Sequence, residues 1–187
     1  GHGVAAEVYE ELKGTGAEIC DATCPFVKKI HRIVAENSGE DTEVFIAGDP
    51  NHPEVIGIKG HCKGEVNIFN SEAELDEIIK NDCKNYDKRI IAVSQTTFSQ
   101  KVWKICKEKI KKYYTNAKIF DTICFATRER QDEAALISKQ SDMMIIIGDR
   151  HSSNTAKLKA VCSENCDTYL VERAAELNTI NFSHCAT

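Results

Sequence analysis

Short apolar runs alternate with longer amphipathic segments along this chain of 187 residues. The apolar runs are rich in Val and Ile and are bounded by polar residues, which is typical of buried strands. We therefore expect strands at residues 17–20, 43–47, 65–69, 89–93, 117–120, 143–147 and 168–171. In the intervening segments apolar residues recur every three or four positions, which predicts helices. These helices are expected at residues 4–13, 25–36, 72–79, 99–113, 126–138 and 153–165, with a short one starting at Pro53.

Strands separated by helices form βαβ units, so the pattern predicts an α/β fold built on parallel sheets. Ligands of such folds bind in crevices outside the carboxyl ends of the strands. Polar clusters follow predicted strands at residues 48–54, 94–97 and 148–154. These loops are therefore the first candidates for a functional site.

Two stretches of the chain repeat each other at an offset of 100 residues. Residues 21–24 (Asp-Ala-Thr-Cys) correspond to residues 121–124 (Asp-Thr-Ile-Cys), and the apolar runs before residues 48 and 148 each end in Gly-Asp. A histidine in a polar loop follows each Gly-Asp, as His52 and His151. A period this long marks a repeated subdomain rather than a solenoid. Because equivalent residues lie at equivalent points of a repeated fold, the repeat singles out Cys24 and Cys124.

The repeat also predicts how the chain is divided. Residues 21–120 form one α/β unit, residues 121–187 form another that lacks its final segment, and residues 1–20 are interpreted as the end of a preceding unit. We therefore expect a longer protein with three related units, the missing one bringing a third cysteine equivalent to Cys24 and Cys124.

The charge and the apolar content narrow the range of partners. A net charge of −5 argues against nucleic acid, because proteins that bind it carry a basic surface. The lysine-rich residues 101–112 are interpreted as the solvated face of a helix, with a docking surface for an acidic protein as the alternative. No run of 18 apolar residues and no signal-peptide pattern is present, so we expect no membrane partner and a cytoplasmic location.

The nine cysteines argue against a disulfide scaffold. Disulfide scaffolds are short and loop-rich, whereas this chain has long regular elements and an odd number of thiols. Most of the cysteines are expected to be small buried hydrophobes, with Cys24 and Cys124 as the exceptions. Three converging thiolates suggest a [4Fe–4S] cluster with one iron left open to a substrate oxygen. A zinc-binding module that uses Cys20, Cys24 and histidines is an alternative.

Five sequence strings, taken in order, carry a resemblance to a known family. They are Asp-Ala-Thr-Cys-Pro at 21–25, His-Pro-Glu-Val at 52–55, Ser-Gln-Thr-Thr at 94–97, Thr-Ile-Cys-Phe-Ala-Thr at 122–127 and Ser-Ser-Asn at 152–154. Together they resemble 4-hydroxy-3-methylbut-2-enyl diphosphate reductase, the terminal iron–sulfur enzyme of the methylerythritol phosphate route to isoprenoids. The family pattern extends beyond both ends of the chain, and its members are trefoils of three α/β units around a central cluster.

The resemblance implies a role for ten residues. It makes Cys24 and Cys124 two of three ligands of a [4Fe–4S] cluster, Glu54 the proton source, and Thr96 the residue that positions the substrate hydroxyl. It also implies that the diphosphate is bound by His2, His52, Ser152, Ser153 and Asn154, with Thr97 beside Thr96. The implied reaction removes an allylic hydroxyl and gives isopentenyl and dimethylallyl diphosphates, with electrons from ferredoxin or flavodoxin.

The resemblance assigns no role to several histidines, and a second function class is also considered. His31 is interpreted as an ordinary helix residue, and no role is assigned to His61 and His184. His151 lies next to the predicted site, but the resemblance does not require it. A non-catalytic α/β module that has kept the fold and lost the chemistry is the second function class.

Overall fold

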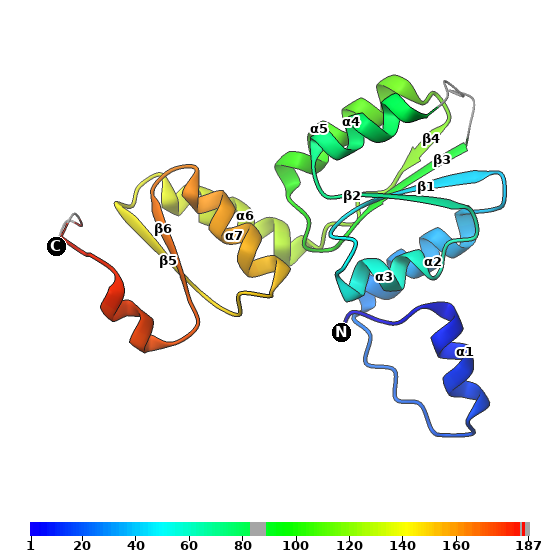
Figure 1. Cartoon of the computed structure of the whole chain (residues 1–187), viewed down its shortest axis with the longest axis horizontal. Helices are drawn as coiled ribbons and strands as arrows, with labels where there is room; N and C mark the ends of the chain where they lie inside the picture. The colour runs from blue at the N-terminus through cyan, green and yellow to red at the C-terminus, as the bar shows by residue number, and fades with distance from the viewer. Residues whose placement is uncertain (83–88, 184, 186–187) are drawn as a thin grey trace. The chain divides into compact units, whose positions relative to one another are not determined.

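The computed structural model describes residues 1–82, 89–183 and 185, so His184 lies outside the described residues. The chain folds into two compact units (Figure 1). Unit 1 contains residues 1–96 and 101–122, and unit 2 contains residues 97–100 and 123–187. The proposed assignment of residues 1–20 to a separate unit, and the trefoil arrangement, stay predictions.

Unit 1 is built on a parallel sheet of four strands in the order β2-β1-β3-β4. The strands are β1 (Thr42–Ala47), β2 (Glu65–Phe69), β3 (Arg89–Ser94) and β4 (Ala117–Ile119). Helices α2 (Pro25–Asn37) and α3 (Pro53–Lys59) cover one face, and α4 (Glu72–Asn81) and α5 (Gln100–Tyr113) cover the other (Figure 1). The predicted α/β class with parallel sheets is confirmed.

The core of unit 1 explains why its central strands are continuous apolar runs. Every residue of β1 is buried, because the strand has a neighbour on each edge and helices on both faces. On the side of α2 and α3, Val44 and Ile46 of β1 pack in one cluster with Ile30, Val34, Val55, Ile58 and Val93. On the other side the rings of Phe45 and Tyr114 meet edge to face at 5.5 Å.

Unit 2 has a smaller parallel sheet of two strands, β5 (Met143–Ile147) and β6 (Asp167–Val171). Helices α6 (Phe125–Ser138) and α7 (Ser153–Ser163) belong to it, and a 3₁₀-helix, η1 (Ala174–Thr179), follows β6. Although β5 is as apolar as β1, its residues are only partly buried, and Ile147 is 78% exposed. Within the described residues, β5 pairs with β6 alone, so less of its surface is covered.

The structure corrects the sequence-based elements mainly near the N-terminus. Residues 17–20 form no strand, because they extend from the turn at Gly16 (φ +73°) without a neighbouring strand to pair with. Helix α1 spans Ala6–Gly14 and so starts two residues later than expected. The short helix η1 was not predicted. The other helices and strands are confirmed, with bounds that differ by two residues or fewer.

The offset of 100 residues also holds in three dimensions. A Cβ atom on Gly48 would lie 2.6 Å from a methyl carbon of Val55, and one on Gly148 would lie 2.6 Å from the hydroxyl oxygen of Thr155. Both glycines end a strand and let the next helix approach closely. The sequence repeat is therefore a repeat of structure.

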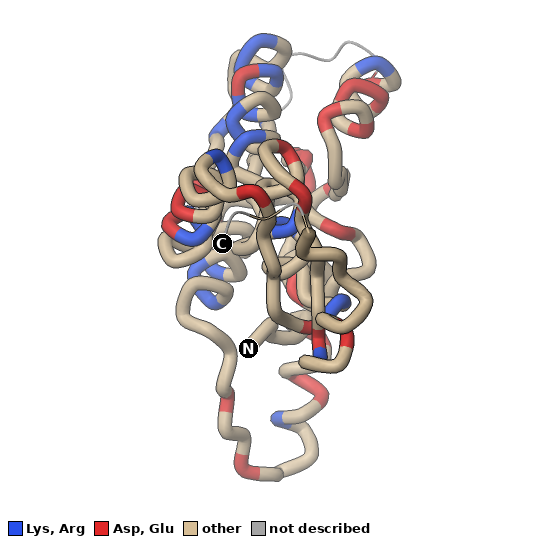
Figure 2. Tube along the Cα trace, turned by 90° about the vertical axis from the view of Figure 1, so that its left-hand side faces the viewer, with Lys and Arg blue, Asp and Glu red and all other residues tan. Residues whose placement is uncertain are grey.

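Charged residues segregate on two helices of unit 1, because α5 carries mainly basic and α4 mainly acidic residues. Acidic and basic positions are interleaved along most of the chain (Figure 2). In α5, Lys107 pairs with Asp121, and Lys109 pairs with Glu72 and Asp76. These pairs fit the interpretation of α5 as a solvated helix face. No described helix combines the length and the apolar character that crossing a membrane requires.

Candidate functional site

Cys24 and Cys124 occupy equivalent positions, each at the N-cap of a helix. Cys24 precedes α2 with φ −55° and ψ 134°, and Cys124 precedes α6 with φ −61° and ψ 138°. In both cases the carbonyl oxygen of the cysteine accepts the first helical hydrogen bond, from Lys28 and from Arg128 at 3.0 Å. Neither thiol caps its helix, and both are partly exposed, so each sulfur is free to bind a ligand.

The position of these two thiols suits metal binding. A helix N-terminus stabilises negative charge, and therefore a thiolate. Other cysteines lie in different surroundings, and burial raises the pKa of Cys62 and of Cys106 to about 12. Cys62 and Cys106 are therefore protonated packing residues at neutral pH.

The donor set fits an iron–sulfur group in its chemistry, although not in its number of ligands. Soft thiolates are the ligands that iron–sulfur clusters take. Cys24 lies in unit 1, and Cys124 lies in unit 2. Within the described residues, no three His, Cys, Asp or Glu side chains come together as they would around a metal ion. The zinc module that uses Cys20, Cys24 and histidines therefore gains no support.

Glu54 is held at the carboxyl edge of the unit 1 sheet by the loop that follows β3. Its side chain is only 2% exposed. The Thr96 backbone N–H donates to Oε1 at 2.6 Å, and the Thr96 hydroxyl donates to Oε2 at 2.8 Å. The sequence-predicted pair of Glu54 and Thr96 thus forms one hydrogen-bonded group in which both carboxyl oxygens have a partner.

His52 is oriented by the helix that it starts. Its Nδ1 accepts a hydrogen bond from the Glu54 backbone N–H at 3.1 Å, so the ring carries its proton on Nε2. The His2 ring stands edge-on to the His52 ring, with 4.9 Å between centroids. Partial burial, and next the neighbouring His2, lower the pKa of His52. At neutral pH the ring is therefore a neutral donor through Nε2–H.

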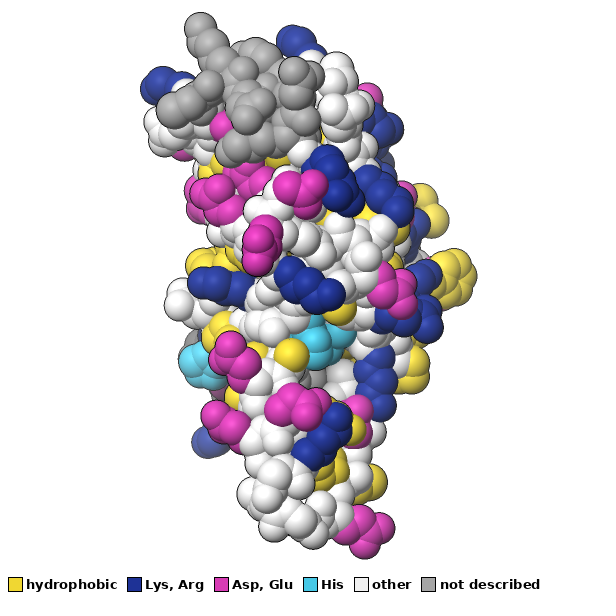
Figure 3. Space-filling view, turned by 90° about the vertical axis from the view of Figure 1, so that its right-hand side faces the viewer, with side chains coloured by type: hydrophobic (Ala, Val, Ile, Leu, Met, Phe, Trp, Pro, Cys, Tyr) yellow, Lys and Arg dark blue, Asp and Glu magenta, His cyan; other side chains and the backbone are white. Residues whose placement is uncertain are grey.

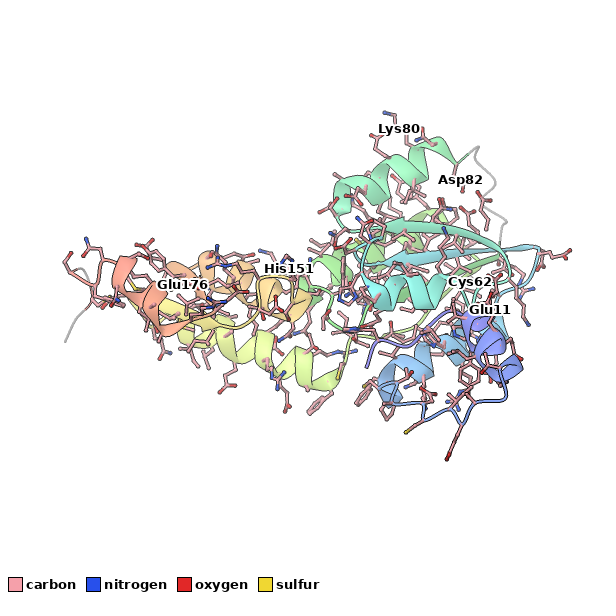
Figure 4. The ribbon with its side chains drawn as sticks, turned by 60° about the horizontal axis from the view of Figure 1, so that its bottom comes forward. Glu11, Cys62, Lys80, Asp82, His151 and Glu176 are labelled. Carbon is pink, nitrogen blue, oxygen red and sulfur yellow. The ribbon has the colours of Figure 1, made fainter. Side chains whose placement is uncertain are left out.

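The polar residues of unit 2 gather at the N-terminus of α7. The Ser152 hydroxyl caps this helix by accepting from the Thr155 backbone N–H, and the Thr97 hydroxyl donates to the Ser153 hydroxyl at 2.9 Å. Asn154 Oδ1 is buried and has no partner within the described part of the chain. Backbone N–H groups and hydroxyls at a helix N-terminus are suited to bind anions such as phosphate. His151, labelled in Figure 4, is exposed in the turn just before this helix.

Gln95, which is 1% exposed, was not among the site residues predicted from the sequence. Its Oε1 accepts from the Asp49 backbone N–H at 3.4 Å, so it links the loops that follow β1 and β3. Its Nε2 has no hydrogen-bond partner within the described residues. The signal was present in the sequence, because Gln95 directly follows a buried strand at the edge where ligands bind. No role was predicted for this glutamine, which lies among serine and threonine residues in the string at 94–97.

Thr122 was also given no role, although it links the loop after β3 to the repeated motif at residues 121–124. Its Oγ1 accepts from the Ser94 backbone N–H at 2.7 Å and donates to the Ser94 carbonyl oxygen at 2.7 Å. A third contact joins the two hydroxyl groups at 3.1 Å. This buried group fixes the start of the Ser94–Thr97 loop to the segment just before Cys124.

Comparison with known proteins finds relatives that are similar over nearly the whole chain. The family described as "LytB protein" matches residues 1–187. The chain is 43% identical over 177 residues to the 4-hydroxy-3-methylbut-2-enyl diphosphate reductase of Caldanaerobacter subterraneus. The alignment covers 94% of this chain and 59% of that protein. It is 38% identical to the reductase of the same name from Clostridioides difficile, over 95% of this chain and 62% of that protein.

Two solved structures are similar over most of the chain. The E-1-hydroxy-2-methyl-but-2-enyl-4-diphosphate reductase from Plasmodium falciparum aligns with a TM-score of 0.80 and 28% identity, over 95% of this chain and 56% of that one. A structure of (E)-4-hydroxy-3-methyl-but-2-enyl diphosphate reductase aligns with a TM-score of 0.59 and 35% identity, over 94% and 62%. The chain thus spans about six tenths of the length of the relatives that it matches.

Proposed function

This chain belongs to the LytB protein family, and from that premise we propose that it is part of a 4-hydroxy-3-methylbut-2-enyl diphosphate reductase of isoprenoid biosynthesis. The observation that carries the proposal is the match to relatives with that name over 94% of the chain. The buried pair of Glu54 and Thr96 supports it independently, because it provides a carboxyl and a hydroxyl at the ligand-binding edge of a parallel sheet.

Cys24 and Cys124 are two ligands of a [4Fe–4S] cluster, and a third ligand comes from outside the present sequence. The cluster, when bound, supplies electrons and a Lewis-acidic iron. The support is the equivalent placement of the two cysteines at helix N-caps, with partly exposed thiols that cap nothing.

The diphosphate is bound by neutral donors. His52 offers Nε2–H because its Nδ1 is engaged by the helix, and His2 lies beside it. Ser152, Ser153 and Asn154 offer the N-terminus of α7. Hydrogen bonds from such donors to an anionic oxygen are stronger than neutral ones.

Glu54 and Thr96 act on the hydroxyl that leaves. Thr96 orients this hydroxyl, and Glu54 delivers the proton with which it departs as water. The C–O bond breaks, two electrons enter, and a second proton is added to the allylic carbon skeleton, which gives isopentenyl or dimethylallyl diphosphate. A ferredoxin or flavodoxin supplies the two electrons. We place the reaction in the cytoplasm.

An absorption spectrum of the anaerobically purified full-length protein, with metal analysis, tests this proposal. If the protein is the reductase, its spectrum should show a broad band at about 400 nm, and it should contain iron and sulfide in equal amounts. A colourless protein with stoichiometric zinc would favour the zinc module. A colourless protein without metal, even after reconstitution with iron and sulfide, would favour a module that has lost the chemistry.

A further inference from the structure

The N-terminal segment, residues 1–6, is fixed to α2 and α3 by main-chain hydrogen bonds. The Cys24 backbone N–H donates to the Gly1 carbonyl oxygen at 3.0 Å, and the Ala6 backbone N–H donates to the Gly60 carbonyl oxygen at 3.3 Å. Between these points, Nε2 of His61 lies 3.0 Å from the Val4 carbonyl oxygen. Because a carbonyl oxygen only accepts, His61 carries its proton on Nε2 and donates it.

Glycines allow this segment to lie close to the helices. A Cβ atom on Gly60 would lie 2.2 Å from the Cβ of Ala5, and one on Gly57 would lie 3.3 Å from Nε2 of His31. Gly3 has φ +73°, and a Cβ atom there would lie 2.5 Å from Cε1 of His31. The approach therefore depends on the absence of side chains on both sides of the contact.

His31 and His61 form a stacked pair at this contact. Their ring centroids are 4.1 Å apart and the planes differ by 24°. His31 is 8% exposed, and its Nε2 has no hydrogen-bond partner within the described residues. The ring of His31 thus fills space under Gly3 and supports the ring of His61, which in turn holds Val4. On the face of the molecule in Figure 3, histidine side chains reach the surface among hydrophobic and acidic ones.

His2 lies within the segment that this pair holds. Its ring meets the ring of His52 at 4.9 Å, and His52 is itself fixed by its hydrogen bond to the Glu54 backbone. One side of the His2–His52 pair is therefore set by α3, and the other side by residues 1–6. If the segment is displaced, His2 therefore moves while His52 stays in place.

We infer that His31 and His61 are positioning residues, which clamp residues 1–6 onto α2 and α3 and so place the His2 imidazole against His52. The effect on diphosphate binding rests on the proposed function, whereas the clamp itself does not.

Hydrogen–deuterium exchange on the full-length protein tests the clamp directly. Gly3→Ala and His61→Ala should each speed exchange at the Ala6 and Cys24 amides by about tenfold or more, since these amides open with the segment. Gly16→Ala is the matched control for Gly3→Ala, because Gly16 has the same φ of +73° and nothing lies within 4 Å of its Cβ position. It should leave both amides unchanged. His61→Gln, which keeps a donor for Val4, should restore most of the protection.

Titration with inorganic diphosphate tests the consequence. His61→Ala should lower the affinity for diphosphate by the same factor as His2→Ala, on the order of tenfold. The double variant should bind diphosphate no more weakly than His2→Ala alone. Additive losses would overturn the positioning role, and unchanged exchange in Gly3→Ala and His61→Ala would overturn the clamp. If His2→Ala leaves diphosphate affinity unchanged, the assigned role of His2 fails, and the exchange result alone decides the clamp.

Discussion

The carboxyl group of Glu54 is buried, yet both of its oxygens accept hydrogen bonds from the same residue, Thr96. This arrangement holds the proposed proton donor and the proposed substrate-orienting hydroxyl in a fixed relation, which a proton transfer to a leaving group requires. His52 is also fixed by a main-chain contact, through the backbone N–H of Glu54. Main-chain hydrogen bonds thus set the orientation of two predicted site residues.

Glu54→Gln should keep the shape of this group and lose its proton. The glutamine Oε1 still accepts from the Thr96 backbone, and its Nε2 donates to the Thr96 hydroxyl after that hydroxyl rotates. We expect kcat to fall by about 10²-fold or more, with substrate affinity and iron content retained. Glu43→Gln is the control, because Glu43 is also a buried carboxylate, on β1, and has no part in the proposed reaction. Steady-state kinetics with a chemical reductant measure both, and a near-normal kcat for Glu54→Gln would exclude it as the proton donor.

The two N-cap cysteines should behave differently from the buried ones. Cys24→Ser and Cys124→Ser should each abolish or severely weaken cluster binding in the full-length protein, because a hard hydroxyl replaces a soft thiolate. Cys62→Ser and Cys106→Ser should keep their iron, because these thiols have their pKa raised to about 12 by burial and are protonated. Cys83, one of the cysteines that the sequence predicts to be buried hydrophobes, is a further control and lies outside the described residues. Equal iron loss in all variants would show a folding defect and refute the assignment.

At the scale of helices and strands, the sequence predicted most of the fold because local signals agreed with tertiary contacts. Apolar runs became strands where a sheet covered them, as in β1. The predicted strand at 17–20 failed because pairing is a non-local property that its composition does not encode. The partnership of His31 and His61 was equally hidden, because they lie 30 positions apart on α2 and just after α3.

The stacked histidines predict a pH dependence of stability. Burial, and next the proximity of His61, lower the pKa of His31 to about 4, while Asp21 opposes the shift. The unfolded chain, with a histidine pKa near about 6.5, binds more protons than the native state between those values. The contribution of neutral His31 to the free energy of unfolding is therefore fully present above about pH 6.5. It is lost as the pH drops toward 4, a loss of roughly 3 kcal/mol in all.

Urea unfolding of the iron-free full-length protein between pH 7.5 and 5 measures this effect. His31→Phe keeps a flat ring and should flatten the dependence of the unfolding free energy on pH. The exposed His151 provides the control, and His151→Phe should leave the dependence as it is in the unaltered protein. A dependence that persists undiminished in His31→Phe would assign it to other groups.

At the scale of the whole molecule, the residues of the predicted site are divided between the two units. Unit 1 contains Cys24, His52, Glu54 and Thr96, and unit 2 contains Cys124, Thr97 and the Ser152–Asn154 cap. The repeat predicted which positions matter, and the resemblance added their roles. Neither predicted Gln95, whose significance lies in a buried amide nitrogen that has no partner within the described residues rather than in a motif.

The 187-residue chain by itself should hold no stable cluster. It contains two of the three thiolates that the family resemblance implies, and it spans 59% of its Caldanaerobacter relative. Anaerobic reconstitution with iron and sulfide should give substoichiometric iron, while circular dichroism shows the α/β content. A stable, stoichiometric [4Fe–4S] centre on these residues would mean that the ligands have been counted wrongly.

Turnover of the full-length protein tests the central claim most directly. The anaerobic, cluster-loaded protein, supplied with a chemical reductant and (E)-4-hydroxy-3-methylbut-2-enyl diphosphate, should consume the substrate and release isopentenyl and dimethylallyl diphosphates, both quantified by mass spectrometry. The same preparation carrying Glu54→Gln should release neither at a comparable rate. A fully loaded protein that binds the substrate and leaves it unchanged would contradict the assignment of this chain to a reductase.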